Sequence, residues 1–203
     1  MSRNLAALVA LAALAGLVLQ FIVSGANPAL ADPLARLWVL ARFFTILTNA
    51  LVLLSFGLLA LGRAPSDAWM AGVVLSIAMV GIVFHLLLAP EVPLTGLTFW
   101  ADLWLHTLTP LLAALWWLGW GGRALSLTDV PKWLIWPAGY CLYALLRGQT
   151  DGIYPYFFID VGQFGWTRVA LNIAGLCLGF ALAGLVLLGI ARALARSGRL
   201  ARP

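Results

Sequence analysis

The chain has 203 residues, of which 64% are hydrophobic and only 9% are charged. A water-soluble domain needs more charge to cover its surface, so this composition excludes a soluble enzyme or binding domain and indicates a surface that faces lipid. The net charge of +5 does not indicate nucleic-acid binding, because the basic residues are dispersed and mostly flank apolar runs.

Hydropathy predicts an all-α fold, a polytopic membrane bundle of six transmembrane helices. A spanning helix takes about 20 apolar residues, so six of them with short connectors use nearly the whole chain. The predicted spans lie near residues 5–23, 43–61, 69–89, 102–119, 133–147 and 168–190. Clusters of Gly, Pro, Ser and Asn separate them. No room remains for a soluble domain, so we expect a single membrane domain over residues 1–203.

The first span has an alternative interpretation as a cleaved signal peptide. The start of the chain has the features of a leader with a cleavage site. An apolar run follows Arg3, and the small residues Ala29-Leu30-Ala31 precede Asp32. The run is long for a signal core and has the length of a span. We therefore favour a retained helix.

The distribution of Lys and Arg predicts the orientation of the bundle. With six spans, the two termini and the second and fourth connectors share one side, which holds Arg3, Arg63, Arg123, Lys132, Arg192, Arg196, Arg199 and Arg202. The other side holds Arg36, Arg42, Arg147 and Arg168, together with Asp32, Glu91, Asp102, Asp151 and Asp160. The positive-inside rule then predicts a multi-pass protein with both termini in the cytoplasm.

Polar residues inside the predicted spans concentrate in the outer half of the bilayer. These residues are Gln20, Thr45, Thr48, Asn49, His85, Asp102, His106, Arg147, Arg168 and Asn172. The inner halves carry only small hydroxyls such as Ser55 and Ser76. Polar groups at membrane depth are costly and indicate function, and a transport path needs them on both sides of the midplane. The pattern therefore predicts a one-sided pocket.

Helical spacing groups these residues into two candidate faces. Steps of three and four place Arg42, Thr45 and Asn49 on one face, and Asp102, His106 and Thr109 on another. A hydroxyl that faces an imidazole suits covalent acyl transfer, in which the hydroxyl attacks and the histidine takes and returns its proton. Asp102, one turn before His106, could orient the imidazole ring, and Pro110 could loosen the helix locally.

Non-catalytic interpretations of the same residues stay open. A threonine in a membrane helix often bonds its own backbone. His85 and His106, on adjacent spans at similar depth, could hold a b-type haem between two imidazoles. A lipid-binding protein without catalysis is a further alternative. Cys141 and Cys177 lack the spacing of a metal or redox motif and are expected to be buried thiols. We predict no metal and no cofactor.

Three blocks of sequence, in span order, resemble a known family. They are Arg42-Phe43-Phe44-Thr45-Ile46-Leu47-Thr48-Asn49, then Trp100-Ala101-Asp102-Leu103-Trp104-Leu105-His106-Thr107-Leu108-Thr109-Pro110, then Tyr154-Pro155-Tyr156-Phe157-Phe158-Ile159-Asp160 with Gly165 and Arg168. Their order resembles the androgen-induced-protein family of membrane proteins, in its bacterial branch. Vertebrate members of that family hydrolyse fatty acid esters of hydroxy fatty acids, using an intramembrane threonine nucleophile and a histidine.

The resemblance implies a lipid-ester hydrolase in the bacterial inner membrane, with membrane lipids as its surroundings and a lipid ester as its substrate. Thr45 falls on the position of the nucleophile and His106 on that of the general base. The resemblance gives His85 no catalytic role. For substrate binding or orientation we expect Arg42, Thr48, Asn49, His85, Asp102, Arg147, Tyr154, Arg168 and Asn172 to contribute. Within this set, Arg42 or Arg147 would hold an anionic head group, and Asn49, Thr48 or Arg168 would donate to the oxyanion.

Overall fold

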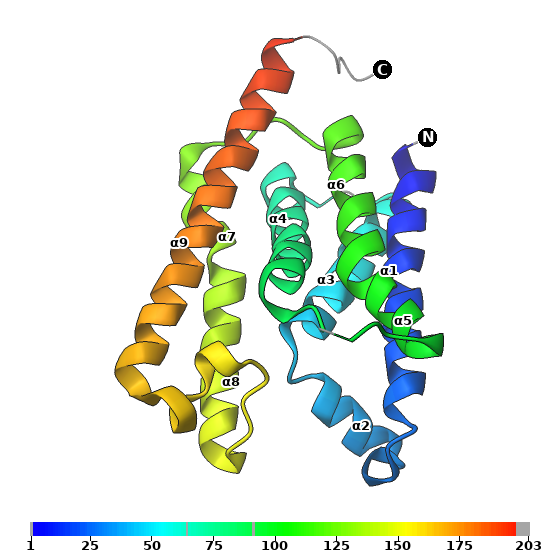
Figure 1. Cartoon of the computed structure of the whole chain (residues 1–203). Coiled ribbons are helices and arrows are strands. Elements are labelled where there is room, and N and C mark those ends of the chain that lie inside the picture. Colours follow the sequence, from blue (N-terminus) through cyan, green and yellow to red (C-terminus); the bar gives the residue numbers. More distant parts are fainter. Residues whose placement is uncertain (1, 64, 91, 198–203) are drawn as a thin grey trace.

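The computed structural model describes residues 2–63, 65–90 and 92–197, and it contains helices and turns but no strand over these ranges (Figure 1). The predicted all-α class is therefore confirmed. The helices are α1 Ser2–Ser24, α2 Pro33–Leu40, α3 Phe44–Ala60, α4 Asp67–Val83, α5 Gly96–Leu103, α6 Thr109–Trp120, α7 Val130–Trp133, α8 Ile135–Asp151 and α9 Val161–Arg196. Short 3-10 turns lie at η1 Pro28–Leu30, η4 Leu127–Asp129 and η5 Phe157–Ile159. Two π-helical turns, η2 Phe84–Leu88 and η3 Trp104–Leu108, follow α4 and α5.

Local sequence signals explain where several helices begin and end. The Asp32 carboxylate accepts from the Ala35 N–H at the start of α2, and the Ser66 hydroxyl accepts from the Trp69 N–H at the start of α4. Gly152 ends α8 in the left-handed region that glycine adopts without steric cost. Gly165 has a φ of 71° inside α9, so the helix is kinked there and runs on from residue 166.

Three helices are long and apolar enough to cross a membrane, namely Ser2–Ser24, Asp67–Leu88 and Val161–Arg196. A fourth candidate is the pair α2 and α3, which is bent by 98°. By length, α3 and α8 have 17 residues each and α6 has 12, so none qualifies alone. Helices able to cross a membrane are thus present, but this criterion supports three or four spans rather than the predicted six. The short lengths of α3, α6 and α8, and the π-helical turn η3 that separates α5 from α6, account for the difference.

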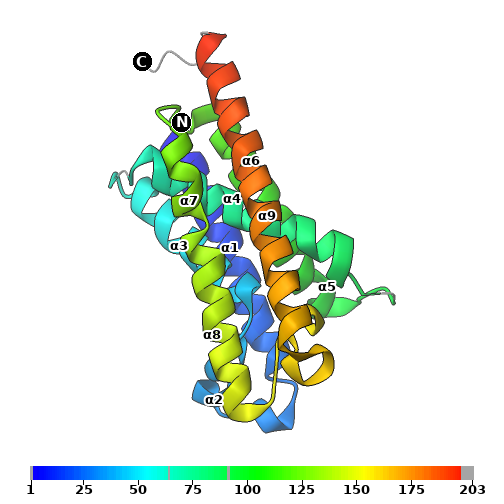
Figure 2. The ribbon, with the colours of Figure 1, turned by 90° about the vertical axis from the view of Figure 1, so that its left-hand side faces the viewer.

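The core lies where α1, α3, α4 and α6 pack together with α7 and the later turns of α9 (Figure 1). On α1, Ala6, Val9 and Ala13 are buried, so the first helix packs into the bundle. The rings of Phe56 on α3 and Trp116 on α6 meet edge to face, with centroids 5.0 Å apart. Figure 2 shows α8 and α9 side by side along the flank of this core.

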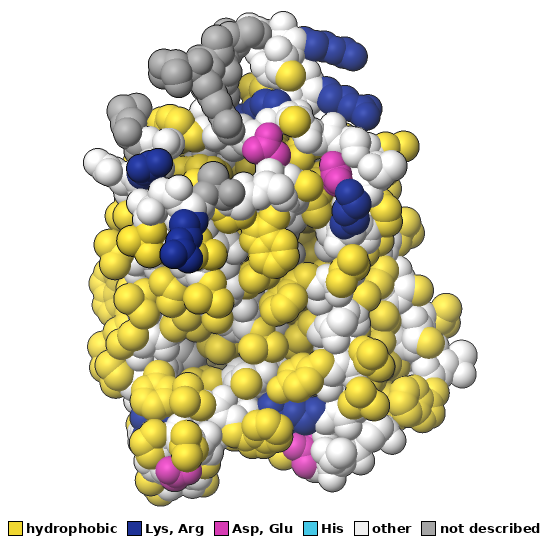
Figure 3. All heavy atoms as spheres, turned by 180° about the vertical axis from the view of Figure 1, so that it is seen from behind, with side chains coloured by type: hydrophobic (Ala, Val, Ile, Leu, Met, Phe, Trp, Pro, Cys, Tyr) yellow, Lys and Arg dark blue, Asp and Glu magenta, His cyan; other side chains and the backbone are white. Residues whose placement is uncertain are grey.

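The surface is apolar around its middle and charged at its ends. The first turns of α1 and the last turns of α9 lie at one end of the bundle, here called the terminal end, and α2 and the turn after α8 lie at the opposite, distal end (Figure 1). Figure 3 shows Lys and Arg gathered towards the terminal end, a broad hydrophobic band below them and a smaller charged group at the distal end. The band suits contact with lipid. Three charged residues that contribute to the predicted orientation, Arg199, Arg202 and Glu91, lie outside the described residues.

Candidate active site

Thr45, His106 and Asp102 form a hydrogen-bonded triad. Thr45 lies in the first turn of α3, and its Oγ1 is 3.3 Å from Nε2 of His106 in η3. The other ring nitrogen, Nδ1, is 3.0 Å from Oδ1 of Asp102 at the end of α5. A carboxylate is an acceptor only, so we assign the ring proton to Nδ1 and leave Nε2 free to accept from the threonine. This tautomer is the one that a general base requires.

The backbone around His106 is a π-helix, and Pro110 removes one of the hydrogen bonds that would continue it. In a π-helix the carbonyl of Leu105 pairs with the N–H of residue 110, but Pro110 has no N–H. The side-chain amide of Asn49 donates to this carbonyl instead, at 3.3 Å, and also to the carbonyl of Thr45 at 2.9 Å. Asn49 is fully buried. It therefore ties α3, which carries Thr45, to the π-helical turn that carries His106.

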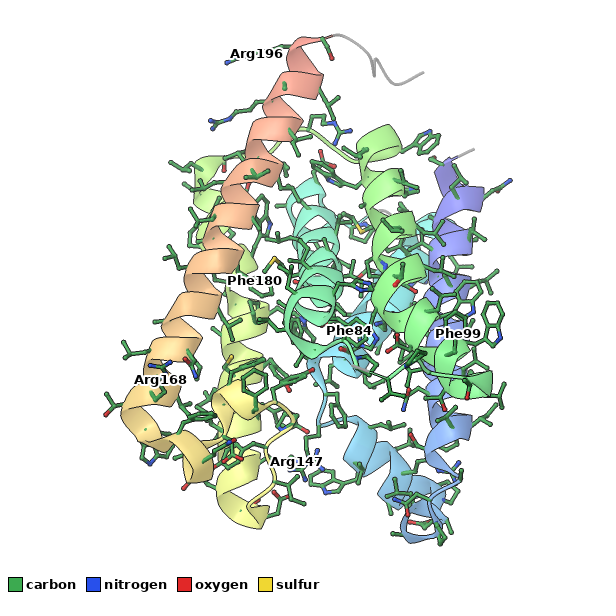
Figure 4. All side chains as sticks on the ribbon, viewed as in Figure 1. Phe84, Phe99, Arg147, Arg168, Phe180 and Arg196 are labelled. Carbon is green, nitrogen blue, oxygen red and sulfur yellow. The ribbon has the colours of Figure 1, made fainter. Side chains whose placement is uncertain are left out.

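Phe84 fixes the plane of the imidazole. Its ring is stacked on that of His106, with centroids 3.7 Å apart and planes within 10°. Figure 4 places Phe84 in the middle of the bundle, above the distal turns. The neighbouring Gly81 lets α4 approach closely, because a Cβ there would stand 3.0 Å from the His106 carbonyl oxygen. Sequence analysis did not select Phe84, since a phenylalanine in an apolar span carries no distinguishing signal.

Tyr156 closes the site from the loop between α8 and α9. Its hydroxyl accepts from the Phe44 N–H, at 3.1 Å, and thereby caps α3 directly beside Thr45. The same hydroxyl also neighbours the backbone and hydroxyl of Thr45, and burial raises the pKa of Tyr156. The predicted loop residue was Tyr154, whose hydroxyl accepts instead from Gln149. The sequence therefore pointed to a residue of the right segment, but not to Tyr156, which lines the site pocket described next.

A pocket of about 290 Å³, here called the site pocket, opens onto Thr45 and His106. Its walls come from α1, α2, α3, both π-helical turns and the Tyr156 loop, and its lining residues are Gln20, Leu40, Phe43, Thr45, Ile46, Phe84, Leu88, Leu105, His106, Pro155 and Tyr156. A second, smaller apolar pocket of about 60 Å³ reaches Thr45 from the side of α4, α8 and α9. Thr45, Leu88 and Tyr156 line both pockets, so the threonine hydroxyl is approached by apolar space from two sides.

Arg42 and Arg147 are predicted to bind a head group, but neither lines the site pocket. Both are buried and hold neighbouring segments of the chain together. Arg42 is 5% exposed and pairs with Asp151 at the end of α8, with a further bond to the Ile153 carbonyl. It does not share a face with Thr45, because the helix begins only at Phe44, after the sharp bend. Arg147 is also buried, and it donates to the Trp38 carbonyl at 2.6 Å beneath the Trp38 ring.

The remaining predicted residues separate into structural and peripheral positions. Thr48 is fully buried and accepts from Trp136 Nε1 at 3.0 Å, which directs its hydroxyl towards α8. Asn172 donates to the Phe158 carbonyl at 2.8 Å and so anchors the Tyr156 loop to α9. Arg168 is exposed on α9 towards the distal end (Figure 4). None of the three is brought to the Thr45 hydroxyl.

His85 is exposed, and its Nε2 is 3.0 Å from the hydroxyl of Thr107. It is not part of the triad, and both ring nitrogens of His106 already face Asp102 and Thr45. This arrangement does not present two imidazoles to a shared haem iron. Over the described part of the chain, no group of three or more His, Cys, Asp or Glu side chains is placed to hold a metal ion.

Comparisons with known proteins found no matching family model, no matching curated protein and no matching solved structure. The resemblance drawn from the three sequence blocks therefore stays a prediction. The candidate site stands on its own geometry.

Proposed function

We propose that the protein is an intramembrane lipid-ester hydrolase with Thr45 as nucleophile, His106 as general base and Asp102 as the residue that orients His106. The observation that carries this proposal is the triad, a hydroxyl 3.3 Å from one imidazole nitrogen and a carboxylate 3.0 Å from the other. Catalytic hydrogen bonds are often long before substrate binds, so 3.3 Å suits a resting site.

The reaction follows from these three groups. Thr45 Oγ1 attacks the ester carbonyl carbon while its proton passes to His106 Nε2. The tetrahedral intermediate collapses by breaking the bond to the alcohol oxygen, which takes that proton and leaves an acyl group on Thr45. A water molecule then attacks the acyl carbonyl while its proton passes to His106. The bond between the acyl carbon and Thr45 Oγ1 breaks, Oγ1 takes the proton back from His106, and the fatty acid is released. Asp102 accepts from His106 Nδ1–H and stabilises the imidazolium that forms in each half.

The pockets support a lipid substrate. Both are lined mainly by apolar side chains, and the site pocket adds only a few polar groups, as small-molecule sites typically do. The resemblance to the androgen-induced-protein family favours the same class, fatty-acyl esters such as those of hydroxy fatty acids.

Six crossings, with both termini in the cytoplasm of a bacterial cell, remain our proposal for the topology. Two observations support it. The start of α1 and the end of α9 lie at the same end of the bundle, which an even number of crossings requires (Figure 1). On the face drawn in Figure 3, Lys and Arg gather towards that end, as the positive-inside rule expects. The triad then lies in the outer half of the membrane.

Hydrolysis of a fluorogenic long-chain ester by the purified protein tests the function. We expect Thr45→Ala and His106→Ala each to reduce kcat by at least about 10³-fold. Without the nucleophile or the base, only substrate binding and the remaining stabilisation of the transition state contribute to the rate. Thr48→Ala is the matched control, one turn along the same helix, and should retain its rate. Full activity in Thr45→Ala would refute the proposal.

Lipid binding without catalysis is the second candidate, and a separate cavity favours it. About 630 Å³ lies between α3 and α4 on one side and α7 and α8 on the other, lined mostly by apolar and aromatic residues such as Trp69, Trp133 and Trp136. This candidate predicts that purified protein carries lipid which Gly72→Leu or Gly139→Leu displaces. It also predicts no ester turnover in the wild type, which separates it from the hydrolase.

A further inference from the structure

An acyl transfer at Thr45 needs a hydrogen-bond donor for the negative charge that develops on the carbonyl oxygen. The donors expected from the sequence are occupied or distant. The Asn49 amide nitrogen donates to the carbonyls of Thr45 and Leu105. Thr48 faces Trp136, and Arg168 is exposed on α9. The donor must therefore come from another part of the site.

We propose that the hydroxyl of Tyr156 is this donor and makes Tyr156 a further catalytic residue of the hydrolase. The inference rests on the proposed function. Tyr156 lines the site pocket together with Thr45 and His106. Its oxygen accepts from the Phe44 N–H, so the phenolic proton is available on the side away from that backbone group, where the hydroxyls of Thr45 and Tyr140 are its neighbours. The hydroxyl lies beside the Thr45 side chain, where the carbonyl under attack must come.

The ring of Tyr156 is held rigidly, as a preorganised donor requires. It stacks on Phe158, with planes within 6° and centroids 5.2 Å apart, and meets Phe43 edge to face at 6.4 Å. The loop is anchored at both sides of Tyr156. Arg42 donates to the Ile153 carbonyl, and Asn172 donates to the Phe158 carbonyl.

Burial also keeps the donor in its protonated form. It raises the pKa of the Tyr156 hydroxyl above its ordinary value, so the phenol stays neutral at physiological pH. During attack the phenolic O–H bonds to the oxyanion without transferring its proton, and the bond is released when the intermediate collapses.

Tyr156→Phe tests the inference, because it keeps the ring contacts and removes only the hydroxyl. We expect kcat for a long-chain ester to fall about 100-fold, with KM nearly unchanged. Tyr154→Phe, in the same loop, is the matched control and should keep the wild-type kcat. A thionoester develops its charge on sulfur, a weak acceptor, so the loss caused by Tyr156→Phe should be much smaller with that substrate.

Equal losses on ester and thionoester, or a loss confined to KM, would assign Tyr156 a purely structural role and overturn the inference. Full activity in Tyr156→Phe would also overturn the inference. If Thr45→Ala is inactive in the same assay, the hydrolase proposal still stands, so the two failures can be told apart. If Tyr156→Phe does not fold, a difluorotyrosine at position 156 keeps both hydroxyl and packing but ionises at lower pH. The alkaline limb of the kcat profile should then move to lower pH, and an unmoved limb overturns the inference.

Discussion

The imidazole of His106 lies flat against the ring of Phe84, 3.7 Å between centroids. This stack, the bond to Asp102 and the approach of Thr45 restrict the histidine from three directions. Hydropathy gives no reason to expect a function for Phe84, yet the stack sets the angle at which Nε2 of His106 meets the threonine hydroxyl. The site is therefore built as much from apolar packing as from its polar groups.

Replacing Phe84 by Leu should impair catalysis without changing the chemistry of the triad. The aliphatic side chain fills most of the volume but offers no flat face to hold the imidazole. We expect kcat to fall roughly 10-fold to 100-fold with little change in KM, since small misplacements of a catalytic group are costly. Phe99→Leu, at an exposed ring on α5, is a suitable control. A wild-type kcat in Phe84→Leu contradicts the orienting role.

Asp102→Asn should keep the shape of the site and remove the charge opposite Nδ1. The amide can donate to Nδ1, which would move the ring proton to Nε2 and deprive Thr45 of its base. By analogy with hydrolase triads we expect kcat to fall about 10³-fold to 10⁴-fold. Steady-state hydrolysis measures this loss, and Asp160→Asn provides a control, because Asp160 caps α9 outside the site pocket. A loss below tenfold would show that His106 needs no carboxylate.

Asn49→Ala should lower stability more than it alters substrate binding. The change removes the donor to the Leu105 carbonyl, which Pro110 leaves without a π-helical partner, and the donor to the Thr45 carbonyl. An unsatisfied buried carbonyl costs about 1–3 kcal/mol. Unfolding of the detergent-solubilised protein by heat should therefore begin at a lower temperature. Ser55→Ala, on the same helix and also buried, is the comparison, and equal stability of Asn49→Ala and wild type would contradict the bridging role.

The pair of Arg42 and Asp151 should stabilise the protein over a wide range of pH. The bonds from Arg42 lower the pKa of Asp151 to about 2, against about 3.9 in an unfolded chain. A carboxyl with a depressed folded pKa stabilises the fold fully above its unfolded pKa and loses that effect as pH falls through its folded pKa. Asp151→Asn should thus melt at a lower temperature than wild type, by the same margin at pH 8 and pH 5. A margin that disappears between these values contradicts the pair's role.

Sequence reasoning reached the centre of the site because helical spacing and resemblance both point to particular residues. Thr45, His106 and Asp102 are polar residues in apolar spans, and Asp102 and His106 remain one turn apart even though η3 is π-helical. Arg42 was misplaced because its spacing to Thr45 and Asn49 was counted as helical, whereas Arg42 lies in the bend between α2 and α3 and the helix begins only at Phe44. No pattern within one helix reports where the neighbouring helix begins.

Tyr156 and Phe84 could not be selected from sequence for a different reason. Both reach His106 or Thr45 through contacts between segments far apart in the chain, and a Tyr among other aromatic residues looks like interfacial packing. Helix lengths do not confirm the six predicted spans, for a related reason. Hydropathy locates apolar segments, whereas the ends of α3, α6 and α8 are set by bends, prolines and turns that shorten the regular helix.

Covalent labelling tests the central claim, that His106 activates Thr45 as a nucleophile, most directly. The purified wild-type protein is treated with a long-chain fluorophosphonate, digested and mapped by mass spectrometry, alongside Thr45→Ala, Thr45→Ser, Thr48→Ala and His106→Ala. The account predicts a single adduct on Thr45 in the wild type and in Thr48→Ala, an adduct on the serine in Thr45→Ser, and none in Thr45→Ala or His106→Ala. An adduct that persists in Thr45→Ala, or labelling of Thr45 at the wild-type rate in His106→Ala, would contradict it.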